Sequence, residues 1–337
     1  MTGVNRIKSP IDYNRRPLLL FGAAVCFCLL LGWLAYRAFF SIYLDNERRL
    51  SAQRLDAFAL SLEATLARHE SLPSLLALDP ALAALLRAPD DGARISAANA
   101  YLEAAQQSAS VAAAYLIDTD GKTLAASNWR LPRSFVGHNY AFRPYFRDAL
   151  AHGLGRFYGV GVTTGESGYF LAAPVRENGR NLGVVVLKVG LEAMEQAMAG
   201  AGETLLLSDA DGIVFLSSER KLRYRALAPL NEKVMARLSE TRQYGNQPIS
   251  PLAEQPIPAG QQASPLQIAL PDETSRERLI TTRPVGTQGW QVVQLGDPGE
   301  ARAAALGAAI AVAFAAAFTL GLAAHFRHRT RRREELR

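Results

Sequence analysis

Cysteine is almost absent from this chain of 337 residues, which contains only Cys26 and Cys28. Both lie inside one apolar run near the N-terminus, so the remaining sequence cannot form a disulfide. Its stability must therefore come from the burial of apolar side chains, which its length permits. Because the two cysteines sit among lipid-compatible residues, we interpret them as helix-packing positions and not as a metal or redox pair.

Histidine is also scarce. The five histidines are isolated or lie in a basic C-terminal segment, and no two have the spacing of metal ligands on a helix. The sequence contains no Walker-type phosphate loop and no G-x-S-x-G nucleophile elbow. We therefore find no catalytic motif and expect no metal or cofactor.

The net charge of +6 is concentrated at the two ends of the chain. Residues 1–17 contain four basic residues and one acidic residue, and residues 325–337 contain six basic and two acidic residues. The body between them is close to neutral. A nucleic-acid-binding surface is therefore not expected.

Charge is absent from residues 18–36 and 303–324, and each run has about the length of a membrane-spanning helix. A cleaved signal peptide is the alternative for the first run. Bulky residues follow that run and no small-residue cleavage site is evident, which favours a retained anchor. Basic residues flank the outer side of both runs, which predicts cytoplasmic termini. The predicted boundaries are a cytoplasmic N-terminus at 1–17, transmembrane helices at 18–40 and 303–326, and a basic cytoplasmic tail at 327–337.

Residues 41–110 have the pattern of a long stalk helix followed by a small helical cap. Leu55, Phe58, Leu62 and Leu66 recur at three- and four-residue spacing among charged residues, as on one face of a helix. Several prolines then interrupt the pattern before another helical stretch near 93–108.

A strand pattern begins after the cap. Residues 113–127 contain two apolar runs around Asp120-Gly121, a strong hairpin signal. Further strands are predicted at 156–164, 168–175 and 182–189. A short helix is predicted in between, with Pro144 at its first position and Gly153 just past its end.

The same pattern then recurs. Residues 205–218 match the first hairpin at an offset of 91, and residues 278–296 match the later strand pair at an offset of 110. We infer an α+β fold with two tandem modules, each an antiparallel sheet with helices, at 111–200 and 201–300.

The stretch FVGHNYAFRPYF, residues 135–146, is unusually aromatic, with five aromatic residues in twelve against 8% for the whole chain. Arg143 precedes a proline, so its backbone should be extended at the start of the predicted helix, where an anion is favoured. Arginine also grips carboxylates with two parallel hydrogen bonds. Thr163 and Thr164 lie between glycines, and Lys188 lies in an otherwise apolar strand. This set predicts a pocket for a small anion.

Each of these residues also has a purely structural interpretation. Arg143 can stack on Phe142 and pair with Asp148. The two threonines are ordinary strand residues, and Lys188 can point outward from a two-sided sheet. Tyr140 and Tyr145 can be core aromatics. Spacing alone leaves both interpretations open.

Four blocks of this sequence together resemble the sensor half of C4-dicarboxylate-sensing histidine kinases, the DctB family. The blocks are YLIDTDGKTLAASNW, FVGHNYAFRPYF, GVTTGESGYFLAAPV and GVVVLKVGLEAMEQ. The resemblance implies tandem PAS-like (double Cache) modules on a long helix, anchored in the bacterial inner membrane with the modules in the periplasm. It also implies a homodimer through the stalk helix.

The resemblance further implies that the membrane-distal module, 111–200, binds succinate, fumarate or malate. By motif, its ligand contacts are Tyr140, Arg143, Thr163, Thr164 and Lys188. We expect Arg143 and Lys188 to hold the two carboxylates, with Phe135 and other phenylalanines of the aromatic stretch packing the module.

The C-terminus departs from the family pattern, because no phosphoacceptor or ATP-binding block follows the second apolar run. We expect a sensor fragment or a truncated protein, with a response regulator as partner only through the missing kinase region. Two alternatives remain. One is a receptor for another small carboxylate or an amino acid with a chemotaxis or cyclase output, in which Asp148 or Glu166 would face an ammonium group. The other is a truncated sensor that does not signal.

Overall fold

The computed structural model describes residues 16–200, 203–253, 256–257, 264–268, 270 and 276–335. They divide into two compact units. One unit contains the segments up to Ser51 and from Asp297 onward, and the other is Ala52–Gly296.

The described residues of the first unit include two helices that are long and apolar enough to cross a membrane. They are the N-terminal part of α1 (Arg16–Glu70) and α8 (Gly299–Glu335). The helices pack closely at Gly32, where a β-carbon would lie 3.3 Å from the carbonyl oxygen of Ala309. Small residues at such a contact let two helix backbones approach, which is how membrane helices commonly associate.

The second unit contains two five-stranded antiparallel sheets built to one plan. The first has the order β2-β1-β5-β4-β3 and the second the order β7-β6-β12-β11-β10. The first sheet comprises β1 (Ala113–Asp118), β2 (Thr123–Ala126), β3 (Gly155–Val160), β4 (Ser167–Glu177) and β5 (Arg180–Val189). The second comprises β6 (Thr204–Ser208), β7 (Val214–Ser217), β10 (Ser264–Ile268), β11 (Arg276–Val285) and β12 (Trp290–Gly296). The strand orders therefore confirm the predicted internal repeat. The hairpin β1–β2 and the pair β4–β5 hold the same places in the first sheet as β6–β7 and β11–β12 hold in the second.

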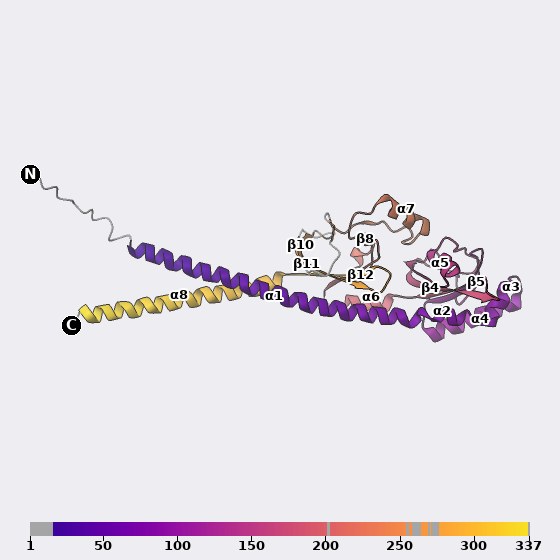
Figure 1. Cartoon of the computed structure of the whole chain (residues 1–337), viewed down its shortest axis with the longest axis horizontal. Helices are drawn as coiled ribbons and strands as arrows, with labels where there is room; N and C mark the ends of the chain where they lie inside the picture. Colours follow the sequence, from indigo (N-terminus) through magenta and orange to yellow (C-terminus); the bar gives the residue numbers. More distant parts are fainter. Residues whose placement is uncertain are drawn as a thin grey trace, which may run out of the picture. The chain divides into compact units, whose positions relative to one another are not determined.

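In the first sheet, α5 (Pro144–His152) lies on one side of β4 and β5, and α2 (Leu72–Leu76) and α4 (Gly92–Ala109) lie on the other side (Figure 1). Together with α3 (Pro80–Arg87), α2 and α4 form the helical cap. The remaining elements are α6 (Glu192–Ala199), η1 (Arg220–Leu222), β8 (Arg225–Ala226), α7 (Glu232–Thr241) and β9 (Ser250–Pro251).

The helix start at α5 follows the prediction from the sequence. Arg143 occupies the N-cap position with extended backbone angles (φ −79°, ψ 134°) and without a side-chain capping bond, and Pro144 is the first helical residue. Gly153 ends it in the left-handed region at φ +84°, which an L side chain adopts only with strain.

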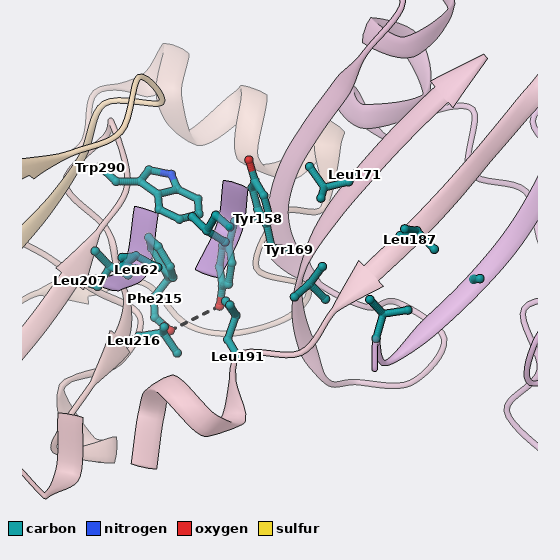
Figure 2. Close-up of a cluster of buried hydrophobic side chains, with 14 of the residues drawn as sticks. Leu62, Tyr158, Tyr169, Leu171, Leu187, Leu191, Leu207, Phe215, Leu216 and Trp290 are labelled. Atoms are coloured by element: carbon teal, nitrogen blue, oxygen red, sulfur yellow. Dashed lines mark hydrogen bonds between the residues drawn. The ribbon is translucent and has the colours of Figure 1, made fainter. Parts of the chain in front are cut away.

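A single hydrophobic core joins the two sheets and α1 (Figure 2). Tyr158 of β3 packs on Phe215 of β7, with ring centroids 4.1 Å apart, and its hydroxyl donates to the Phe215 carbonyl at 3.3 Å. Trp290 of β12 meets both rings edge-on. Leu62 of α1 belongs to the same core, so the part of α1 that lies in the second unit packs with both sheets.

The apolar stripe predicted on the stalk helix is confirmed, and it packs in the core shared with the two sheets. Leu55, Leu62 and Leu66 are all buried in the shared core, and Phe58 packs against it. The stripe therefore packs on the chain's own sheets. Its presence is not by itself an argument for a dimer.

Candidate functional site

A cavity of about 410 Å³ opens on the α5 side of the first sheet. We call it the Lys188 cavity. Its wall is formed by Lys188, by Thr164 and Glu166 of the β3–β4 turn, and by the segment from Asn128 to Phe135 that follows β2. Its volume lies within the range of pockets that bind small molecules.

Lys188 enters this cavity because of its position in β5. Side chains alternate between sheet faces, and Val184 and Val186 face α5, so Lys188 faces the same way. Its side chain is only 2% exposed, which rules out the alternative in which it points into solvent. The ammonium group donates to Thr164 Oγ1 at 3.2 Å and to Glu166 Oε2 at 3.3 Å.

The buried environment of Lys188 disfavours the positive charge of its ammonium group. Burial lowers the pKa of the Lys188 ammonium, and the neighbouring Glu166 carboxylate offsets part of that effect. The Glu166 side chain is 67% exposed, so solvent weakens its attraction to the buried ammonium. An ammonium has three N–H donors, and two acceptors meet it among the described residues. The group is suited to bind an anion that enters the cavity.

The β3–β4 turn positions the threonines. Gly161 N–H donates to the Glu166 carbonyl at 2.8 Å, and Gly165, at φ +76°, closes the turn by donating to the Gly161 carbonyl at 2.7 Å. A β-carbon at Gly161 would lie 2.7 Å from Thr164 Oγ1. Glycine is therefore required for Thr164 to approach Lys188.

Tyr140 and Thr163 form a second polar pair, and neither residue is on the wall of the Lys188 cavity. The Tyr140 hydroxyl lies 2.6 Å from Thr163 Oγ1. The Tyr140 ring is buried against Tyr115 and Phe135, and this burial raises the pKa of its hydroxyl. The ring thus belongs to the core, as the structural interpretation held, while the hydroxyl reaches the β3–β4 turn.

Arg143 is buried, with 1% of its surface exposed, and its guanidinium binds backbone carbonyls. Nη2 donates to Val160 at 2.6 Å, and Nη1 donates to Thr241 and Arg242 at 3.1 Å each. The last two carbonyls close the C-terminal end of α7, where carbonyl groups lack helical partners and a cation is favoured. Its stacking over Phe142 is confirmed, with 5.3 Å between Cζ and the ring centroid.

Burial lowers the pKa of the Arg143 guanidinium, and the buried tyrosine hydroxyls near it act in the opposite direction. The guanidinium nevertheless stays charged at physiological pH, because the ordinary pKa of arginine is above 12. Arg143 is therefore a fixed positive charge inside the protein, beside the cavity but not on its wall.

Two glycines separate Arg143 from Lys188. A β-carbon at Gly159 would lie 3.3 Å from Arg143 Nη1, and one at Gly161 would lie 3.8 Å from Lys188 Nζ. Alternate residues of an extended chain are about 7 Å apart, so the two cations lie beside the two ends of residues 159–161, where neither glycine has a side chain to displace them. Lys188 lies on the cavity wall and Arg143 does not, so the division of labour between these cations stays a prediction.

Sequence reasoning missed Arg133 and Asn128. Arg133 lies on the cavity wall and donates to the Thr164 carbonyl at 2.9 Å. Asn128 fixes the loop that carries it, accepting from Phe135 N–H at 3.1 Å and donating to the Arg133 carbonyl at 3.0 Å. The S-N-W block after the hairpin was the available signal, but it gave no indication that the loop turns back over the sheet.

Asp148 does not line the Lys188 cavity, so Glu166 is the carboxylate available to an ammonium group there. Among the residues that the structure describes, no cluster of His, Cys, Asp and Glu could hold a metal ion. The wall combines Lys188 and Arg133 with a single carboxylate. Its chemistry is that of a receptor for a small anion.

Residues 43–305 match the Cache domain family, so the match covers most of the chain. Two relatives are each named C4-dicarboxylate transport sensor protein DctB. The Pseudomonas aeruginosa protein is 39% identical over 189 residues, which cover 56% of this chain and 31% of that protein. The Rhizobium meliloti protein is 33% identical over 288 residues, which cover 83% of this chain and 45% of that protein. The matched part of this chain thus spans less than half of each relative.

Solved structures agree with this assignment. The sensor domain of the V. cholerae histidine kinase DctB has a TM-score of 0.69 and 30% identity, covering 75% of this chain and 98% of that one. The ligand-binding domain of the Pseudomonas fluorescens chemoreceptor CtaA, in complex with L-leucine, has a TM-score of 0.51 and 16% identity, covering 76% and 97%. The latter likeness concerns the fold alone. The chain belongs to the Cache domain family and, within it, to the DctB-type sensors.

Proposed function

We propose that this chain is the sensing part of a membrane-anchored receptor for C4-dicarboxylates that acts in two-component signalling. The names of the DctB relatives support the ligand class. The observation that carries the proposal for this chain is the buried ammonium of Lys188 on the wall of a cavity of about 410 Å³. A buried cation is costly unless it meets a partner or a ligand.

The proposed ligand-binding module is 111–200, with Tyr140, Arg143, Thr163, Thr164 and Lys188 as ligand contacts. Lys188 and Thr164 hold one carboxylate. Arg143 holds the other after exchanging its bonds to the α7 carbonyls for bonds to the ligand. Because these carbonyls belong to the second module, 201–300, that exchange makes ligand binding and the contact between the modules depend on each other.

The proposed membrane arrangement uses both apolar helices as spans, 18–40 and 303–326. The basic segments beside them are cytoplasmic, and the sheets lie in the periplasm. We propose a homodimer through the stalk of α1, where Leu60 is 60% exposed outside the buried stripe. The kinase and its response regulator act through a region outside this chain.

Thermal unfolding of the detergent-solubilised full chain against succinate, fumarate and malate tests the proposal. A ligand at 100 times its dissociation constant should stabilise the folded state by about 2.7 kcal/mol. This corresponds to a rise in Tm of roughly 5–10 °C. Lys188→Met should remove most of the rise, whereas Lys122→Met, at an exposed lysine of the first hairpin, should keep it in full. No shift with any of the three acids would refute the proposal.

A receptor for an α-amino acid is the second candidate, because the Glu166 carboxylate lines the same cavity. It would pair with the ligand ammonium group while Lys188 holds the carboxylate. Glu166→Gln distinguishes the two. The substitution should weaken binding of an amino acid, but strengthen binding of a dicarboxylate by removing a competing negative charge.

A further inference from the structure

A second cavity, of about 460 Å³, lies in the second module. We call it the Arg225 cavity. Residues 220–225 form one part of its wall and residues 247–250 the other. Four of the six residues from 220 to 225 are lysine or arginine.

The Arg225 cavity occupies a comparable place in the repeated fold to the Lys188 cavity. The segment that follows β7 forms part of the wall of the Arg225 cavity, and the segment that follows β2 forms part of the wall of the Lys188 cavity. These two strands hold the same place in their sheets. Both modules thus build a cavity under the chain that leaves the hairpin.

Arginine predominates over carboxylate at this wall. Arg223 Nη1 lies 2.9 Å from Glu195, and the exposed Arg220 lies 4.0 Å from the same oxygen. Arg225 donates to Ser250 Oγ at 2.6 Å, and its hydrogen bonds and ion pairs in the described part of the chain include no carboxylate. Three guanidinium groups therefore share one carboxylate, which leaves an excess of two positive charges.

Arg223 is held in place by several contacts. Its Nη2 donates to Ser167 Oγ at 3.1 Å and to the Tyr224 hydroxyl at 3.0 Å. Its Nε is buried and has no hydrogen-bond partner among the described residues. A buried donor without an acceptor is costly, which favours an acceptor brought by a ligand.

The backbone between Arg223 and Arg225 is constrained. Tyr224 has φ +60°, a conformation that is uncommon for a residue other than glycine. Its N–H donates to the Val214 carbonyl at 2.7 Å, and Arg225 pairs with Ser250 in a short parallel ladder. The two arginines are thus positioned in advance, and not presented by a free loop.

We propose that the Arg225 cavity is a second binding site of this chain, for a small oxyanion of the carboxylate or phosphate class. Guanidinium groups bind both kinds of oxyanion through paired hydrogen bonds. Arg225 and Arg220 supply the charge, and Ser250 and Tyr224 supply hydroxyl groups beside it.

Isothermal titration of the full chain in detergent tests this site, with inorganic phosphate in one arm and succinate in the other. Both titrations are made in the Lys188→Met variant, at constant ionic strength adjusted with chloride. At least one anion should bind with a stoichiometry of one per chain. Arg225→Gln combined with Arg220→Gln should weaken that binding about tenfold or more, since charged hydrogen bonds are lost. The arm that responds identifies the class of anion.

Lys233→Gln is the matched control, because it removes an exposed charge from α7 outside the cavity. It should leave the affinity unchanged. Arg220→Gln alone, at a side chain that is 92% exposed, covers the case in which the double variant does not fold. Equal affinity in the control and the arginine variants, or no heat in either arm, would overturn the proposal. Succinate binding that Lys188→Met removes belongs to the Lys188 cavity, and binding that the arginine substitutions remove belongs to the Arg225 cavity. The two proposals can therefore fail independently.

Discussion

The guanidinium of Arg143 donates to the carbonyl oxygen of Thr241 at 3.1 Å, although the two residues are 98 positions apart in the sequence. Arg143 begins α5 of the first module, and Thr241 ends α7 of the second. One side chain therefore links a helix start in one module to a helix end in the other. The residue predicted to hold a ligand is also a structural tie.

Replacing Arg143 with alanine should destabilise the folded state. The change removes the side-chain donor of the Val160 and Thr241 carbonyls, and an unsatisfied buried acceptor costs about 1–3 kcal/mol. The Arg242 carbonyl still accepts from Gly245 N–H at 3.1 Å. We expect a loss of about 3 kcal/mol in the free energy of unfolding. Trp290 fluorescence during urea unfolding reports it, since that ring lies in the core shared by both sheets.

Arg147→Ala is the matched control for that experiment. Arg147 lies on the same helix and also reaches the second module, through an ion pair with Glu240 at 3.1 Å. Both side chains are more than half exposed, so the pair should contribute less than about 1 kcal/mol. Equal losses of unfolding free energy in the two variants would mean that the buried contacts of Arg143 stabilise the fold no more than the exposed ion pair of Arg147 does.

Lys188→Met should stabilise the ligand-free protein at neutral pH. Burial lowers the pKa of Lys188 in the folded state, so the unfolded chain binds the proton more tightly. The resulting penalty is complete below the folded pKa and disappears as pH rises toward the unfolded value of about 10.4. The difference in Tm between Lys188→Met and the wild type should therefore shrink as pH rises from 7 to 10. A constant difference would contradict this.

Gly161→Ala should weaken ligand binding more than it weakens the fold. The new β-carbon would lie 2.7 Å from Thr164 Oγ1, so the threonine must move away from Lys188. We expect about a tenfold rise in the dissociation constant for succinate, from the loss of one hydrogen bond to a charged group. Gly92→Ala, where a β-carbon meets nothing within 4 Å, should leave the affinity unchanged.

Asp209 should make the stability of the second module depend on pH. Burial raises the pKa of its carboxyl, although Tyr244 donates to it at 2.5 Å and acts in the opposite direction. A raised pKa stabilises the folded state below the unfolded value of about 3.9, and this gain is lost as pH rises through the folded pKa. The Tm of wild type relative to Asp209→Asn should therefore fall between pH 4 and 7. A relative Tm that rises over this interval would be inconsistent with the buried carboxyl.

The sequence was sufficient wherever the relevant interactions are local. The glycine turns predicted the hairpins, and their recurrence predicted two modules, which the equivalent strand orders confirm. Pro144 and Gly153 predicted the limits of α5, since proline fixes the backbone at a helix start and glycine permits the left-handed end. The two apolar runs predicted helices long enough to span a membrane.

Only the tertiary structure decided where the charged side chains of the candidate site lie. Lys188 has two possible faces in a strand pattern, and packing of β5 beneath α5 selects the buried one. Two of the three acceptors of Arg143 are backbone carbonyls 98 and 99 positions away, and a carbonyl has no sequence signature. Arg133 reaches the cavity through a loop held by Asn128. The sequence thus determined the repeated α+β fold through local periodicity and turn chemistry, while long-range packing decided which cations meet a cavity.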